Sequence, residues 1–141
     1  MASIIHKLKI PSSTQFLEDV REFVTTHASE ASFSESVVEQ MKIAVDEACT
    51  NVIEHAYNNE SNHSIDIAVI VNPDRLTVRI RDRGRKFDSQ AYREPDLMAF
   101  AKNRKAGGFG VHIMRRLMDE VQFNSKGGLN ETLLVKFRNA R

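Results

Sequence analysis

Two polar residues that could do chemistry lie four positions apart in the segment AVDEACTNVIEHAY. On a helix, Glu47 and Asn51 stand one turn above each other on the same flank. The carboxamide oxygen of Asn51 is a hard ligand of the kind that Mg²⁺ binds, and the Glu47 carboxylate can accept a proton from a hydroxyl group. The alternative interpretation is a solvated polar face on an amphipathic helix, which explains an isolated Glu-x-x-x-Asn better.

A second polar motif, RDRGRKFD, follows a predicted strand. An aspartate such as Asp82, where a strand opens into a loop, can accept a hydrogen bond from the N6 amine of adenine, whereas guanine presents an oxygen there. Gly84 allows the backbone to approach a ligand closely. Taken alone, the motif fits an ordinary Asp-x-Gly turn better than a ligand site.

A third motif is rich in glycine and directly precedes a predicted helix. The backbone N–H groups around Gly108 and Gly110 can face an anion, and the start of the helix adds its dipole. The motif is neither the G-x-G-x-x-G dinucleotide pattern nor a P-loop, because no Gly-Lys-Ser/Thr occurs. An anion site and a flexible linker that ends at a helix cap explain it equally well.

Hydrophobic periodicity predicts the elements that would position these residues. We expect helices over residues 14–28, 35–57 and 110–120, and strands over 4–10, 65–71, 76–80, 121–124 and 132–137. Helices on one face of a mixed, mostly antiparallel sheet make an α+β two-layer sandwich. Residues 84–107 have no steady period, and a loop of that length usually indicates function or disorder.

Composition limits the classes of function that remain. The 141 residues suit one domain, 1–141, and the formal net charge of +1 gives no reason to expect direct binding to a nucleic acid. No stretch approaches the ~20 apolar residues of a spanning helix, so no membrane role is expected. Cys49 is the single cysteine, which excludes an internal disulfide and fits a cytoplasmic protein.

In this order, the three motifs resemble the nucleotide-binding boxes of the GHKL ATPase superfamily, and most closely its anti-sigma-factor serine-kinase branch. AVDEACTNVIEHAY resembles the N box, RDRGRKFD the first glycine box, and GGFGVHIMRRLMDEV the second; Thr132 resembles the threonine of the last box. The resemblance covers nearly the whole chain. It implies the Bergerat-type ATP-binding fold.

The resemblance also implies a role for each matching residue. Glu47 would be the general base and Asn51 the Mg²⁺ ligand. The nucleotide would be bound by residues from all three boxes and the last one: Asn51, Asp82, Gly84, Gly108, Gly110 and Thr132. Asp82 would bind adenine, with Thr132 near it, and the segment between Asp88 and Gly107 would be a mobile ATP lid.

One residue departs from the family pattern. Lys86 stands where the family often has the second glycine of Asp-x-Gly-x-Gly. If the backbone there required a positive φ, a lysine would cost about 1 kcal/mol or more. Lys86 could instead reach a phosphate.

The function that the resemblance implies is that of a bacterial serine/threonine-protein kinase and anti-sigma-type regulator of transcription. It would bind Mg-ATP, phosphorylate a STAS-type antagonist protein, and bind a sigma factor or another effector; a homodimer is also implied. The alternative is a nucleotide-dependent protein-binding module that transfers no phosphate, which Lys86 favours. A histidine-kinase fragment fits less well, because the N box ends in His55-Ala56-Tyr57 as in the serine-kinase branch.

Overall fold

Five strands form one sheet in the order β1-β2-β3-β5-β4 in the computed structural model, which describes residues 3–86 and 109–138. The strands are β1 (Ile4–Pro11), β2 (Ser64–Val71), β3 (Arg75–Asp82), β4 (Glu120–Lys126) and β5 (Leu129–Phe137). All four strand pairings within the described ranges are antiparallel. All five strands lie where the alternation predicted them, with ends that extend one to three residues further.

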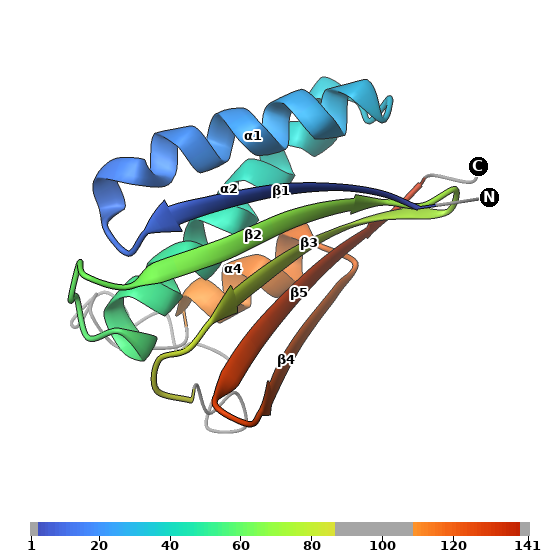
Figure 1. The fold of residues 1–141 in the computed structure, drawn as a ribbon. Helices are drawn as coiled ribbons and strands as arrows, with labels where there is room; N and C mark the ends of the chain where they lie inside the picture. The colour runs from blue at the N-terminus through green and yellow to red at the C-terminus, as the bar shows by residue number, and fades with distance from the viewer. Residues whose placement is uncertain (1–2, 87–108, 139–141) are drawn as a thin grey trace, which may run out of the picture.

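The helices pack on one face of this sheet, as Figure 1 shows. They are α1 (Leu17–Glu30), which the short 3₁₀ turn Thr14–Phe16 precedes, α2 (Glu35–Asn51) and α4 (Phe109–Leu117). Ser34 caps α2 by accepting a hydrogen bond from the backbone N–H of Val37 at 3.2 Å. This arrangement confirms the predicted α+β two-layer sandwich.

Strand alternation decides which face meets the helices. In β3, the residues Leu76, Val78 and Ile80 are 0% exposed, while the residues between them face the other side of the sheet. The helices add their own apolar stripes to the same core, among them Met41 and Val45 of α2. None of the helices in the described ranges is long and apolar enough to cross a membrane.

The helix expected over residues 35–57 ends differently from the prediction. The α-helix stops at Asn51, and Val52–Ala56 continues it as a π-helical turn, in which the N–H of Tyr57 donates to the carbonyl of Val52 at 3.0 Å. Asn58 and Asn59 then take positive φ values of 51° and 63° and turn the chain away. Such π turns are frequent at functional sites, and this one lies directly after Asn51.

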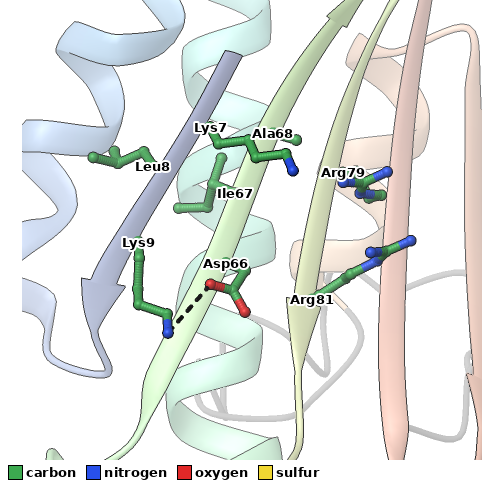
Figure 2. Close-up of a pocket in the computed structure, with 8 residues that line it drawn as sticks. All are labelled: Lys7, Leu8, Lys9, Asp66, Ile67, Ala68, Arg79 and Arg81. Carbon is green, nitrogen blue, oxygen red and sulfur yellow. Dashed lines mark ion pairs between the residues drawn. The ribbon is translucent and has the colours of Figure 1, made fainter. Parts of the chain in front are cut away.

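The face of the sheet opposite the helices carries a separate surface hollow of about 340 Å³ (Figure 2). Half of its lining residues are cationic, and it is lined by Lys7, Leu8, Lys9, Asp66, Ile67, Ala68, Arg79 and Arg81. None of the residues singled out from the three motifs lines it, so this hollow is not the predicted site.

Candidate functional site

The C-terminal half of α2 carries the two residues of the first motif. Glu47 and Asn51 are both partly buried and lie one turn apart, as their spacing predicted. Among the described residues, neither side chain has a hydrogen-bond partner. Within the described part of the chain, nothing competes with a ligand or a metal ion for their oxygens.

The Glu47 carboxylate faces the start of α4. A Cβ added to Gly110 would lie 2.9 Å from Oε1 of Glu47, so the glycine leaves room for that oxygen. Burial raises the pKa of Glu47 above its ordinary value of 4.5, and the charges of Asp46 and Glu54 raise it further. A raised pKa makes this carboxylate a stronger base than an exposed glutamate.

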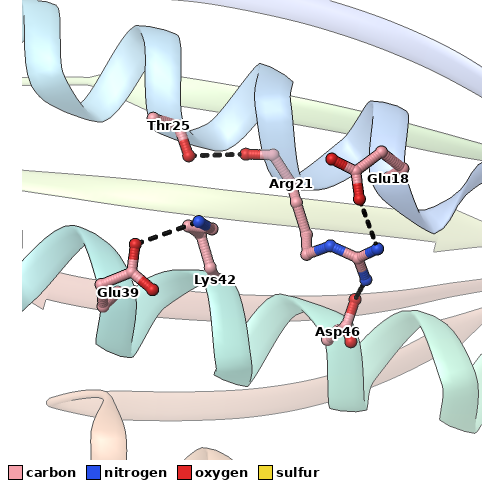
Figure 3. Close-up of polar contacts among 6 residues, drawn as sticks. All are labelled: Glu18, Arg21, Thr25, Glu39, Lys42 and Asp46. Carbon is pink, nitrogen blue, oxygen red and sulfur yellow. Dashed lines mark hydrogen bonds and ion pairs between the residues drawn. The ribbon is translucent and has the colours of Figure 1, made fainter.

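The neighbouring carboxylate, Asp46, is held by the adjacent helix (Figure 3). The guanidinium of Arg21 on α1 donates to Asp46 Oδ1 at 2.8 Å and to Glu18 Oε1 at 2.8 Å. This ion pair joins α1 to α2 one residue before Glu47. Of the two adjacent acids, only Glu47 is left without a partner within the described part of the chain.

Asp82, the last residue of β3, points to the helix side of the sheet and is 5% exposed. Its Oδ1 accepts hydrogen bonds from the N–H of Gly84 at 2.9 Å and from Nδ2 of Asn130 at 2.8 Å. Its Oδ2 has no partner among the described residues. One oxygen of Asp82 is thus fixed by the protein, and the other is available as an acceptor.

Asn130 was not expected from the sequence, yet it holds the second motif together. Its Nδ2 also donates to the carbonyl of Gly84 at 2.9 Å, and its Oδ1 accepts from the hydroxyl of Ser125 at 2.6 Å. A signal was present: in β5 the helix-facing positions begin with two polar residues, Asn130 and Thr132, before Leu134. Buried polar groups at strand ends usually serve a hydrogen-bonded network.

The π turn of α2 fixes the loop that carries Gly84. The N–H of Arg85 donates to the carbonyl of Ala56 at 2.8 Å, and its guanidinium donates to the carbonyl of His55 at 3.1 Å. A Cβ on Gly84 would lie only 2.3 Å from the Ala56 carbonyl oxygen. The close backbone approach predicted at Gly84 is therefore made to the π turn.

Tyr57, which follows the π turn, was also missed. Its hydroxyl donates to the carbonyl of Ser64 at 2.8 Å and accepts from the N–H of Arg83 at 2.8 Å. The side chain thereby joins the end of α2 to the start of β2 and to the loop after β3. Its ring is 5% exposed, so a sequence pattern indicates only a core position.

A pocket brings three of the predicted residues together. Asn51 from α2, Asp82 from β3 and Thr132 from β5 line it. The remaining lining residues come from the π turn, the loop after β3 and the β4–β5 hairpin: Val52, Ala56, Arg85, Phe123, Asn124, Ser125, Asn130 and Glu131. Glu47 and Gly110 form a second pair one helical turn away from Asn51.

Two further expectations concern the glycine boxes. Gly108 and the predicted lid over residues 89–106 lie outside the described residues. Lys86 is described and is not among the non-glycine residues with positive φ, which are Ser32, Asn58 and Asn59. The backbone at Lys86 therefore carries no left-handed penalty, and the strain considered for this departure from the family pattern is absent.

Asn51 is the residue of this site best suited to hold a metal. Mg²⁺ is usually bound through one or two protein oxygens, with waters and substrate phosphates as its other ligands. The carboxamide of Asn51, at the pocket wall and without a partner in residues 3–86 and 109–138, fits this demand. Within the described ranges, the group of side chains close enough to share a metal by themselves is His6, His27 and Glu30, which belongs to a different part of the molecule.

Comparison with known proteins shows the family to which the chain belongs. Residues 10–136 match the family described as histidine kinase-like ATPase domains. The chain is 33% identical to the serine-protein kinase RsbW of Bacillus velezensis, over 94% of this chain and 85% of that protein. It is 31% identical to RsbW of Bacillus subtilis over the same shares and 30% identical to RsbW of Listeria monocytogenes over 95% and 87%.

A solved structure has a similar fold. It is the crystal structure of the RsbU and RsbW domains of a Mycobacterium tuberculosis protein, with a TM-score of 0.67 over 98% of this chain. The match spans about a third of that longer chain, 34%, at 16% identity. At this level of identity the similarity supports the fold alone.

Proposed function

Because the chain belongs to the histidine kinase-like ATPase domain family, we propose that it is a serine-protein kinase that uses Mg-ATP. Its relatives with the name serine-protein kinase match it over 85% of their own length. The observation that carries the proposal is the pair Glu47 and Asn51, whose oxygens have no partner among the described residues and lie at or beside the pocket lined by Asp82 and Thr132. We propose residues 1–141 as a single ATP-binding kinase domain.

The proposed reaction moves the γ-phosphoryl group to a serine or threonine hydroxyl of a protein substrate. Glu47 accepts the hydroxyl proton while the hydroxyl oxygen forms its bond to the γ-phosphorus. The bond between that phosphorus and the bridging oxygen breaks, and ADP leaves with the electron pair. Phosphoryl transfer depends mainly on positioning and on charge stabilisation, and Mg²⁺ held by Asn51 would supply positive charge at the phosphates.

The proposed adenine end of the site is the Asp82 pocket. Oδ2 of Asp82 would accept a hydrogen bond from the N6 amine, while Asn130 and Gly84 hold Oδ1 in place. The cavity has a volume of about 20 Å³, which holds about one water molecule. A purine ring would therefore enter only when side chains that line the pocket, such as the exposed Arg85, move aside.

Gly84, Gly108, Gly110 and Thr132 complete the proposed nucleotide site. Thr132 is 6% exposed and lies opposite Ile80 of β3 in the pairing of β3 with β5, which supports a place beside the base. Gly110 at the start of α4 supports a place for the phosphates, since the first N–H groups of a helix are unpaired and face an anion favourably.

The proposed partners follow the function of an anti-sigma-type regulator. The substrate would be a STAS-type antagonist, and the second partner a sigma factor or another effector; a homodimer is also proposed. No direct contact with a nucleic acid or a membrane is proposed. Cys49 is fully buried, and burial raises its thiol pKa to about 12, so the one cysteine is unreactive and suits the proposed cytoplasmic location.

The test of this proposal is the substitution Glu47→Gln, which keeps the shape of the side chain and removes its basicity. ATP binding, measured by calorimetry, should persist, because Glu47 is proposed to act on the hydroxyl proton. Radiolabel transfer to an antagonist recovered by pull-down should fall by ~10²–10⁴-fold, the usual contribution of a general base. The matched control is Glu39→Gln on the same helix, an exposed residue that pairs with Lys42 at 3.0 Å, and its transfer rate should equal that of the wild type.

Two outcomes would contradict the proposal. If Glu47→Gln transfers phosphate as fast as the wild type, Glu47 is not the base. If the wild type binds ATP and its partners but transfers no phosphate to any antagonist recovered, the protein is the nucleotide-dependent binding module instead.

A further inference from the structure

A second group of ligating side chains lies between β1 and α1, apart from the candidate nucleotide site. His6 sits on the side of β1 that faces the helices, and His27 lies in the last turn of α1. The two imidazole rings are parallel, with centroids 3.7 Å apart and an interplanar angle of 13°. The packing of the strand against the helix thus places two imidazoles in contact.

A carboxylate completes the group. Oε1 of Glu30, one turn after His27 on α1, lies 3.1 Å from Nδ1 of His27. One donor atom each from His6, His27 and Glu30 lie within 4.8 Å of one another. Phe23 also packs against the His27 ring in a T-shaped arrangement, with a centroid distance of 4.8 Å and an angle of 76°, so His27 contacts two other aromatic rings.

We propose that His6, His27 and Glu30 form a binding site for a divalent transition-metal ion, with Zn²⁺ as the preferred ion. Two imidazole nitrogens and one carboxylate oxygen are a ligand set that Zn²⁺ accepts, with a water molecule in the fourth position. Imidazole-rich sites select such ions over Mg²⁺ and Ca²⁺, which prefer oxygen ligands. The site is therefore chemically distinct from the Mg²⁺ position proposed at Asn51.

Metal binding requires only side-chain movement. Zinc bonds to nitrogen and oxygen are about 2.0–2.2 Å long, which places tetrahedral donors about 3.4 Å apart. Donors that lie within 4.8 Å of one another therefore need to close by about 1.4 Å at most. The metal lies in the plane of each imidazole, and the two rings turn out of their stack to face it. The Glu30 side chain is 64% exposed and is free to follow.

The bound ion would join the edge strand of the sheet to the first helix. A ligand that binds only the folded state stabilises it by mass action, so zinc should raise the melting temperature. Both imidazoles must be unprotonated at the metal, so the affinity should fall as the pH is lowered.

The chain provides its own matched control. His63 has a similar environment: its Nε2 lies 2.9 Å from Oε1 of Glu60, and its ring is stacked on Tyr57 with a centroid distance of 4.4 Å and an angle of 6°. The stacking partner there is a phenol in place of a second imidazole. His63→Gln therefore removes a histidine with a carboxylate neighbour and a ring stack while leaving the proposed site intact.

The experiment titrates Zn²⁺ into metal-free full-length protein by calorimetry and follows thermal unfolding of the same samples. The wild type should bind one equivalent. His6→Gln should lose about tenfold or more in affinity, since the loss of even an outer-shell partner costs ~10–100-fold. His63→Gln should match the wild type. Co²⁺ should give visible d–d absorption typical of four-coordinate sites in the wild type, which His6→Gln loses.

Several results would overturn the proposal. They are no zinc binding by the wild type, equal affinity in the wild type and His6→Gln, or an equal loss in His63→Gln. If His6→Gln fails to fold by circular dichroism, Glu30→Gln takes its place, because that exposed side chain can be changed without disturbing the core. Unchanged affinity in Glu30→Gln would then contradict the three-ligand site.

Discussion

The two ends of the candidate nucleotide site differ in how fully their polar groups are satisfied. At the Asp82 end, Oδ1 of Asp82 and the amide of Asn130 are buried and bound within one network with Gly84 and Ser125. At the Glu47 end, the carboxylate and the Asn51 amide have no hydrogen-bond partner among the described residues. Both ends lie on the same side of the sheet, against α2.

This difference indicates that the Asp82 end is suited to position a nucleotide and the Glu47 end to take part in the reaction. A satisfied network in a region of low dielectric constant is rigid, because losing any one bond leaves a buried polar group unpaired. Such an end is suited to select a base by shape and hydrogen bonding. Unpartnered oxygens keep their lone pairs for a metal ion or a proton, and the raised pKa of Glu47 suits proton transfer.

Truncation of one asparagine to alanine at each end should give the largest difference in the free energy of unfolding. Asn130→Ala should lower the free energy of unfolding by about 2–4 kcal/mol, because a buried group left unpaired costs ~1–3 kcal/mol and Asn130 serves both Asp82 and Gly84. Asn51→Ala should change it by no more than about 0.5 kcal/mol, since its amide has no partner to lose among the residues that the structure describes. Urea unfolding followed by circular dichroism measures both, and equal losses would remove the distinction between the ends.

The two glycines of the site should give a smaller contrast of the same kind. Gly84→Ala places a Cβ 2.3 Å from the Ala56 carbonyl oxygen, which is backbone and cannot easily move. We expect a loss of about 1–3 kcal/mol. Gly110→Ala meets only the flexible end of Glu47 at 2.9 Å, so stability should stay within about 1 kcal/mol of the wild type while phosphoryl transfer slows. A larger stability loss in Gly110→Ala than in Gly84→Ala would contradict this assignment.

The smallest effect is expected from Asp46→Asn, which alters the charge beside Glu47. Without that negative charge, the pKa of Glu47 should fall but stay above 4.5, because burial is the larger cause of its shift. The acid limb of phosphoryl transfer should therefore move to lower pH, measured as the rate of label transfer against pH. An unmoved acid limb would show that another group controls it.

The stability of Asp46→Asn has its own dependence on pH. A carboxyl group with a raised folded-state pKa contributes stability that is present below 4.5 and is lost as the pH rises through the raised value. Asp46→Asn brings the folded-state pKa of Glu47 closer to 4.5, so the variant should lose less stability as the pH rises above 4.5. Removing the partly exposed pair with Arg21 costs about 0.2–1 kcal/mol, so the net change at neutral pH should be small.

Most of the fold could be predicted because its signals are local. The alternation of Leu76, Val78 and Ile80 specifies a strand with one buried face wherever that strand lies. The helical spacing of Glu47 and Asn51 places both on one flank for the same reason. The π turn at Val52–Ala56 could not be predicted in this way, because its sequence is compatible with an α-helix and the turn is held by contacts with Tyr57 and Arg85.

The amino-acid sequence alone predicted the order of the elements and the two-layer architecture, and its motifs singled out Glu47, Asn51 and Asp82; Thr132 was singled out by the resemblance to the GHKL superfamily. These follow from periods and motifs that extend over a few residues. The tertiary structure decided which of them meet and what holds them. Asp82 and Asn130 are 48 residues apart, and only the pairing of β3 with β5 places them opposite each other. Hydrogen bonds of this kind depend on strand register, which the packing of the whole sheet determines.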